Sequence, residues 1–260
     1  MEKILEITNV SKSFASETGT PVKALENFSL DVAKGEFVCL LGSSGCGKST
    51  LLGIIAGFEF PDSGKVYAKG KKITGPGTDR VLLFQDATLF PWLNVIGNVE
   101  FGLKAKDIPP KKRREIAMDW IERVHLKGFE KSFVHQLSGG MRQRTAIARA
   151  LAIDPEIILM DEPFCAVDAM TRDMLHQELE KIWSETRKTI VFVTHNVRES
   201  VALGDRVVVF TPRPGSIAGE FKIDLPRPRS LENPAVTTYT AEIMKKLRGA
   251  TQANPGSAEI

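Results

Sequence analysis

The fold is decided by residues 37–49, which read FVCLLGSSGCGKS. Residues 37–41 form a continuous apolar run that ends at a glycine, which is typical of a strand buried on both faces of a parallel sheet. Beyond Lys48, leucine and isoleucine recur at helical spacing up to Gly57, a residue suited to ending that helix. The stretch therefore predicts a strand, a glycine-rich loop and a helix in succession, which is a local unit of an α/β fold.

The glycine-rich loop fits the pattern GxxxxGK[ST] in the strand–loop–helix context that supports it. Its glycines allow successive backbone N–H groups to face a phosphate, and the N-terminus of the next helix adds positive potential. We expect the Lys48 ammonium at the β- and γ-phosphates and the Ser49 hydroxyl at Mg²⁺. The expected nucleotide-binding residues are Gly42, Ser43, Ser44, Gly45, Cys46, Gly47, Lys48, Ser49 and Thr50.

Composition narrows the class of protein without naming a function. The 260 residues are 42% hydrophobic and 26% charged, as in average soluble proteins, and predict one large domain or two small ones. A formal charge of +3 is too small to indicate nucleic acid or an anionic membrane as the partner. No apolar run is long enough to span a membrane, and the first residues do not have the pattern of an export signal. The three cysteines lack CxxC spacing, which favours a reduced, cytoplasmic protein.

Two acids follow a second apolar strand, within residues 156–163, which read EIILMDEP. Ligands of parallel α/β sheets bind outside the carboxyl ends of the strands, so we expect Asp161 and Glu162 to face the phosphate loop. Asp161 suits Mg²⁺ and Glu162 suits an attacking water, although one acid could instead cap the next helix. His195 follows the strand of residues 190–194 at the same edge; a lone histidine there is usually structural, but its convergence with Glu162 favours a catalytic role.

A second glycine cluster lies at residues 137–143, LSGGMRQ, and opens a helix that is expected to run through Ala150. Ser138 can cap this helix, and the glycines would let a phosphate approach its N-terminus; alone, the motif also fits a capped helix without a ligand. In this order, the phosphate loop, Gln85, this cluster, Asp161-Glu162 and His195 resemble the nucleotide-binding subunit of an ABC transporter. The resemblance covers nearly the whole chain.

The resemblance implies an α/β fold: a P-loop NTPase (RecA-like) core sheet with an antiparallel β subdomain and an inserted α-helical subdomain. Helical periodicity between residues 109 and 152 agrees with the insertion. The expected divisions are residues 1–87 for the first part of the nucleotide-binding core, 88–150 for the helical subdomain, 151–225 for the second part of the core, and 226–260 for a C-terminal extension and tail. Asn233-Pro234 predicts the start of a short helix in that extension, and residues 251–260 a loose tail.

The resemblance also implies roles for individual residues. Phe14 matches the aromatic residue that stacks on adenine, and Gln85 the one that contacts Mg²⁺ and water and reports the nucleotide state. The implied catalytic residues are Glu162, His195, Lys48 and Gln85; the implied metal ligands are Ser49, Gln85 and Asp161. Ser138, Gly139, Gly140, Met141 and Asp168 match residues that act on ATP held by the opposite subunit of a head-to-tail dimer. Met141, Cys165 and Asn196 depart from the residues usual in the family, without removing a catalytic group.

Shorter motifs indicate which group of ABC transporters the chain resembles. Residues 75–80, 84–85 and 90–93, with RPG at 213–215 and LPRPR at 225–229, resemble importers of nitrate, sulfonate, taurine and similar small anions. This implies ATP hydrolysis, transmembrane permease partners, a second ATP-binding subunit (identical or a sister), an indirect link to an extracytoplasmic solute-binding protein, no nucleic acid, and a peripheral position on the cytoplasmic face of the inner membrane. The alternatives are bicarbonate or thiamine-precursor import, an exporter subunit, a soluble ABC ATPase and a non-enzymatic nucleotide sensor.

Three features keep two interpretations each. Phe90 and Trp92 are either core residues of the helical insertion or the floor of a groove for a permease helix. The basic run 111–114 is favoured as a solvated helix face over a ligand site. Cys46 is favoured as a small packing residue, although a helix N-terminus would lower its thiol pKa.

Overall fold

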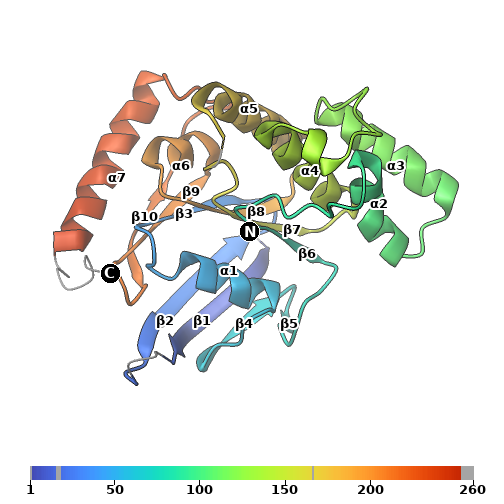
Figure 1. Ribbon diagram of the computed structural model, residues 1–260. Helices are drawn as coiled ribbons and strands as arrows, with labels where there is room; N and C mark the ends of the chain where they lie inside the picture. The colour runs from blue at the N-terminus through green and yellow to red at the C-terminus, as the bar shows by residue number, and fades with distance from the viewer. Residues whose placement is uncertain (1, 16–18, 166, 253–260) are drawn as a thin grey trace. The chain divides into compact units, whose positions relative to one another are not determined.

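A computed structural model describes residues 2–15, 19–165 and 167–252 of the chain (Figure 1). The chain divides into two compact units, one made of residues 1–77 with 187–260 and the other of residues 78–186. Each unit combines helices and strands, in agreement with the expected α/β class. The first unit contains the phosphate loop, and the second contains the acidic pair and the 137–143 cluster.

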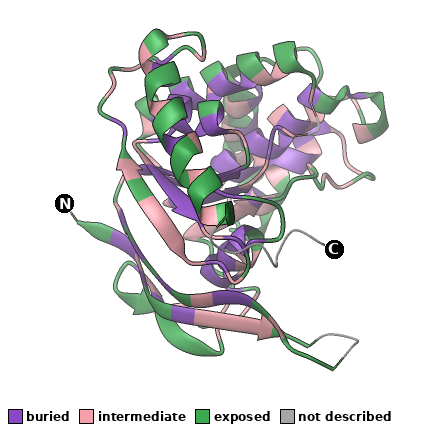
Figure 2. Cartoon of the chain, turned by 90° about the vertical axis from the view of Figure 1, so that its left-hand side faces the viewer, coloured by how far each residue is buried: buried purple, intermediate pink, exposed green. Residues whose placement is uncertain are grey.

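The first unit contains an antiparallel sheet with the strand order β2-β1-β4-β5. Its strands are β1 (Lys3–Phe14), β2 (Val22–Ala33), β4 (Ser63–Ala68) and β5 (Lys71–Lys72). Buried and more exposed residues alternate along much of β1 and β2, as the colours of Figure 2 show. This sheet is therefore covered on one face only, which is common for antiparallel sheets.

The same unit contains parallel strands that position the phosphate loop. They are β3 (Phe37–Leu41), β8 (Thr189–Thr194) and β9 (Arg206–Phe210); β3 pairs with both others, and the antiparallel strand β10 (Ile217–Lys222) extends the sheet beyond β9. Every residue of β3 and β8 is buried, as the continuous apolar runs predict. Helix α1 (Lys48–Ala56) begins within the phosphate loop and is capped by Gly57 in the left-handed conformation, with φ of 85°.

Two further helices complete this unit. Helix α6 (Val197–Leu203) follows β8, and helix α7 (Pro234–Gln252) lies alongside α6 and β10 (Figure 1). Asn233 accepts a hydrogen bond from the Ala235 N–H at 2.9 Å and so begins α7 as predicted. The expectation of a short helix is wrong, because α7 has 19 residues, and the expected loose tail does not begin at residue 251, because Thr251 and Gln252 belong to α7. Residues 253–260 lie outside the described residues.

The second unit is mainly helical. It contains the parallel strands β6 (Arg80–Leu83) and β7 (Ile157–Asp161) with helices α2 (Val95–Ala105), α3 (Pro110–Arg123), α4 (Gly139–Ala152) and α5 (Ala169–Thr186) and a 3₁₀ turn, η1 (Val134–Gln136). Helices α2, α3 and α4 pack against one another. The helical periodicity expected between residues 109 and 152 is therefore confirmed.

Candidate nucleotide site

The phosphate loop follows β3 directly and has the backbone shape that its glycines predict. Gly45 and Gly47 have φ values of 74° and 100°, a region that other residues rarely adopt. A Cβ atom on Gly47 would also lie 2.5 Å from the Ala24 carbonyl oxygen, so a side chain has no room there. The buried Lys48 ammonium donates to the carbonyl oxygens of Gly42 and Ser43 at 2.9 and 2.8 Å. The loop thus places a cation at its centre, next to the N-terminus of α1.

Cys46 packs into the wall of this loop. Its side chain is 1% exposed, and a Cβ atom on Gly42 would lie 2.8 Å from its sulfur. Burial raises the pKa of the Cys46 thiol, although the Lys48 ammonium 3.7 Å from Sγ opposes the change. Burial therefore outweighs the nearby positive charge, so the pKa of this thiol is not lowered by the helix N-terminus. The packing interpretation of Cys46 is the one that fits.

His195 is exposed at the carboxyl end of β8, between two fixed stretches of backbone. Before it, the Thr194 hydroxyl donates to the buried Glu199 carboxylate and accepts a hydrogen bond from the Asn196 N–H at 2.9 Å. After it, the Asn196 side chain accepts hydrogen bonds from the N–H groups of Arg198 and Glu199 and caps α6. Asn196, a departure from the family pattern, therefore serves as a helix cap, and the histidine ring is presented from a well-anchored turn.

Glu199 is the positioning residue that sequence reasoning missed at this turn. A signal for it exists: Asn196 followed three residues later by glutamate has the spacing of a capping box.

Phe14, at the end of β1 in the same unit, is 39% exposed, and the Lys12 ammonium lies 5.2 Å from its ring centroid. Its exposed face is compatible with stacking on a base.

The acidic pair ends β7 in the second unit. Asp161 is the last residue of the strand, and Glu162 follows with φ of 44°, in the left-handed region that glutamate seldom occupies. Strained non-glycine backbone of this kind is concentrated at functional sites, because the surrounding structure must hold it in place. Both side chains are half-buried. This geometry supports delivery of the two acids at the strand end rather than a simple helix cap.

The residues proposed for Mg²⁺ suit that ion by donor type. Ser49 contributes a hydroxyl, Asp161 a carboxylate and Gln85 an amide oxygen, and Mg²⁺ prefers such hard oxygen donors, with water and substrate phosphates completing its shell. Among the residues described by the structure, no group of three or more His, Cys, Asp or Glu side chains is arranged to hold a metal.

Gln85 follows β6 and is exposed. Partial burial is the main cause of the raised pKa of the Cys165 thiol. A hydrogen bond with Gln85 lowers that pKa, and the nearby acids Glu162 and Asp86 raise it. Cys165, the second departure from the family pattern, is thus a neighbour of the residue expected to report the nucleotide state.

The 137–143 cluster forms the capped helix start that was predicted. The Ser138 hydroxyl accepts a hydrogen bond from the Met141 N–H at 3.2 Å, and Ser138 and Gly139 are exposed. Gly140 is buried, and a Cβ atom there would lie 2.6 Å from Cγ2 of Thr171 at the start of α5. Close packing of α4 on α5 therefore accounts for Gly140, while the exposed Ser138-Gly139 end of α4 stays open to an anion.

Asp168 lies next to this contact and is exposed. Its carboxylate accepts a hydrogen bond from the Thr171 N–H at 3.0 Å, which lowers the pKa of Asp168. The residue expected to communicate across a dimer therefore also fixes the start of α5.

Comparison with known proteins decides the family. The family model described as ABC transporter matches residues 25–165, more than half of the chain. The chain belongs to the ABC transporter family. A nitrate import ATP-binding protein of Synechocystis, NrtD, is 43% identical over 94% of this chain and 95% of its own length. A taurine import ATP-binding protein of Roseobacter denitrificans, TauB, is 45% identical over 84% of this chain and 82% of its own length.

Solved structures of ABC cassettes share the fold. The ATP-binding cassette MJ0796, in a dimeric post-hydrolysis state bound to ADP and Pi, is 34% identical, with a TM-score of 0.76 over 85% of this chain and 100% of that one. The P-loop NTPase fold and the ABC resemblance inferred from the motifs are thereby confirmed. In the described part of this ABC chain, no helix has the length and apolar character needed to cross a bilayer.

Proposed function

We propose that this chain is the ATP-hydrolysing subunit of an ABC import system that drives uptake of a small anion through a partner permease. The observation that carries the ATPase part is the phosphate loop itself, with Lys48 buried at its centre and α1 starting beneath it. The import part is supported by relatives named for nitrate and taurine import at 43% and 45% identity. Bicarbonate and thiamine-precursor import remain the alternative substrate classes.

The proposed chemistry assigns one task to each side chain. Lys48 and the loop N–H groups bind the β- and γ-phosphates, and Phe14 stacks on the adenine. Glu162 orients or deprotonates the attacking water, while His195 donates a hydrogen bond to the γ-phosphate. Ser49, Gln85 and Asp161 would hold Mg²⁺, which supplies charge neutralisation on the phosphates when bound.

A second ATP-binding subunit completes the proposed site. Ser138, Gly139, Gly140, Met141 and Asp168 are assigned to ATP bound by the opposite subunit, either an identical copy or a sister chain. The exposed, capped N-terminus of α4 supports this assignment, because such an end attracts an anion. The dimeric state of the cassette MJ0796 with ADP and Pi supports a second ATP-binding subunit.

An exposed aromatic surface on the helical unit is the proposed contact with the permease. It consists of the exposed Trp92 and Phe101 around the half-buried Phe90. The Phe90 ring centroid lies 5.6 Å from that of Trp92 and 4.2 Å from that of Phe101, and Trp92 is 70% exposed. The buried Asn98 side chain holds the loop before α2 through bonds to backbone groups of Phe90 and Leu93. A rigid loop that presents an exposed tryptophan fits a docking surface.

The test is reconstitution of the chain with its permease and solute-binding protein in vesicles, followed by ATP-dependent uptake of nitrate, taurine, an alkanesulfonate and bicarbonate. A thiamine precursor is included as a further solute. We expect ATP-dependent uptake of nitrate, taurine or the alkanesulfonate. Uptake of bicarbonate alone or of the thiamine precursor alone would assign the chain to that alternative substrate class, and lack of co-purification with any permease would contradict the transport proposal.

A further inference from the structure

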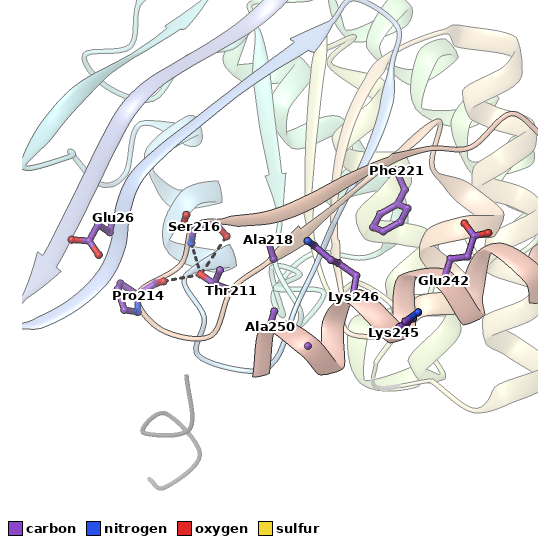
Figure 3. A pocket seen from close by; sticks show the side chains of 11 residues that line it. Glu26, Thr211, Pro214, Ser216, Ala218, Phe221, Glu242, Lys245, Lys246 and Ala250 are labelled. Carbon is purple, nitrogen blue, oxygen red and sulfur yellow. Dashed lines mark hydrogen bonds between the residues drawn. The ribbon is translucent and has the colours of Figure 1, made fainter. Parts of the chain in front are cut away.

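The turn of residues 211–216, between β9 and β10, carries the RPG motif that the proposed mechanism leaves without a role. Three hydrogen bonds close it: the Thr211 N–H donates to the Ser216 carbonyl, the Ser216 N–H donates to the Thr211 hydroxyl, and that hydroxyl donates to the Pro214 carbonyl, each at 2.9 Å. Figure 3 shows the bonds of the Thr211 hydroxyl at the edge of a cavity. The turn is therefore internally braced.

The turn is also fastened to β2. The Gly215 N–H donates to the Ala24 carbonyl at 2.9 Å, and the Glu26 N–H donates to the Gly215 carbonyl at 3.1 Å. Gly215 is buried by this pairing. The side of the turn that faces away from β2 is lined by Thr211, Pro214 and Ser216 and borders an open cavity of about 860 Å³ in front of β10 and α7 (Figure 3). Packing from that side therefore does not fix the position of the turn.

The inner side of the turn contacts the phosphate loop at two successive carbonyl groups. The Arg213 Nε donates to the Gly45 carbonyl at 3.1 Å, and a Cβ atom on Gly45 would lie 2.9 Å from Arg213 Nη2. A Cβ atom on Gly215 would lie 2.1 Å from the Cys46 carbonyl oxygen, so the two backbones meet with no room for a side chain. Gly215 is therefore required by close approach of the two backbones, and Gly45 by its positive φ of 74°.

These contacts set the direction of the loop N–H groups. The carbonyl of one residue and the N–H of the next share a planar trans peptide and point in opposite directions. Because the Gly45 and Cys46 carbonyls face the turn, the N–H groups of Cys46 and Gly47 face away from it. The Cys46 N–H donates to the Ser43 carbonyl at 3.4 Å within the loop, so the Gly47 N–H is the donor that this contact directs toward a phosphate. A phosphate loop functions through such convergent N–H groups, so holding the carbonyls from outside orients the phosphate-binding donors inside.

We propose that Arg213 is a positioning residue of the phosphate loop, acting through the Gly45 carbonyl, and that the RPG turn is the support that keeps the loop shaped for phosphate. The guanidinium also adds a positive charge at the outer side of the loop, which solvent screens because Arg213 is exposed. This inference deepens the proposed ATPase function and rests on it. The role differs from that of Lys48, which is buried at the loop centre.

The test compares Arg213→Ala and Arg213→Lys with Arg248→Ala, which removes an exposed arginine from α7 of the same unit. The measurements are the KM and kcat of Mg-ATP hydrolysis, the Kd of a fluorescent ADP analogue, and the melting temperature. For Arg213→Ala we expect about a five- to tenfold rise in both KM and Kd, with kcat within about twofold and an unchanged melting temperature, because one charge-assisted hydrogen bond is lost at the surface. Arg213→Lys should recover part of the affinity, and Arg248→Ala should match the wild type.

The inference is overturned if Arg213→Ala binds the ADP analogue within about 1.5-fold of the wild type, or if Arg248→Ala weakens binding equally. A wild-type chain that binds the analogue but hydrolyses no ATP would instead refute the proposed function and leave the binding comparison decisive for Arg213. Gly215→Ala is a second variant: its Cβ would press on the Cys46 carbonyl, so affinity should fall more than tenfold. Unchanged affinity in that variant would also overturn the inference.

Discussion

Replacing Trp92 with alanine separates the two interpretations of the aromatic surface. Trp92 is 70% exposed, so the fold covers less than a third of the roughly 250 Å² that a tryptophan can bury. At about 25 cal/mol per Å² its truncation removes at most about 2 kcal/mol from the free energy of unfolding. Trp183 on α5 is 2% exposed, and its truncation should cost about 3–5 kcal/mol. The two substitutions are therefore matched in chemistry and opposite in burial.

The assay has two parts. Urea unfolding of the isolated chain should show a small loss for Trp92→Ala and a large one for Trp183→Ala, with the ATP affinity of Trp92→Ala unchanged. In vesicles containing the permease, Trp92→Ala should hydrolyse ATP without proportionate transport. A loss above about 3 kcal/mol for Trp92→Ala would assign the residue to the core, and full coupling in a stable Trp92→Ala protein would refute the docking role.

Three further outcomes follow from buried polar groups. Arg229, 8% exposed, donates to the carbonyls of Val201, Gly204, Ile223 and Leu225, so Arg229→Met should lower the unfolding free energy by about 3–5 kcal/mol in urea titration; a loss below about 1 kcal/mol would contradict this role. Glu199→Ala removes the partner of the Thr194 hydroxyl and should reduce kcat about tenfold with little change in the KM for ATP, whereas an unaltered kcat would show that this bond does not position the histidine turn. Burial raises the pKa of the Cys46 thiol, so a maleimide should react with it slowly at pH 7, and the rate should rise about tenfold for each unit of pH increase up to that pKa. The modified protein should no longer bind ATP. Rapid labelling at pH 7 with retained ATP binding would contradict the packing assignment.

The elements with strong local signals could be predicted from the sequence. The strand of residues 37–41, the strand of residues 189–194 and the capped start of α4 at Ser138 lie where the patterns place them. Each depends on short-range chemistry: an unbroken apolar run, a glycine-rich turn or a side chain that caps its own helix. The sequence predicts the start of α7 at Asn233 but not its length of 19 residues, because only Val236 and Ile243 in it are buried and so little core contact leaves no clear helix end in the pattern.

Contacts between distant residues could not be predicted in this way. Residues 225–229 were useful only as a resemblance to importers, yet Arg229 binds carbonyls at the end of α6, more than twenty positions earlier. The contact of Arg213 with Gly45 joins residues 168 positions apart. The left-handed backbone of Glu162 is likewise set by its surroundings rather than by glutamate's own preference. Local pattern therefore located the candidate site, and only the fold shows what supports it.

The central claim is that Glu162 acts on water while the phosphate loop binds ATP. Its most direct test is the rate of phosphate release from Mg-ATP by the purified chain, compared between the wild type, Glu162→Gln and Glu115→Gln, which alters an exposed glutamate on α3. We predict that Glu162→Gln binds ATP as tightly as the wild type while hydrolysing it at least a hundredfold more slowly, and that Glu115→Gln behaves as the wild type. Hydrolysis by Glu162→Gln at the wild-type rate would contradict the account.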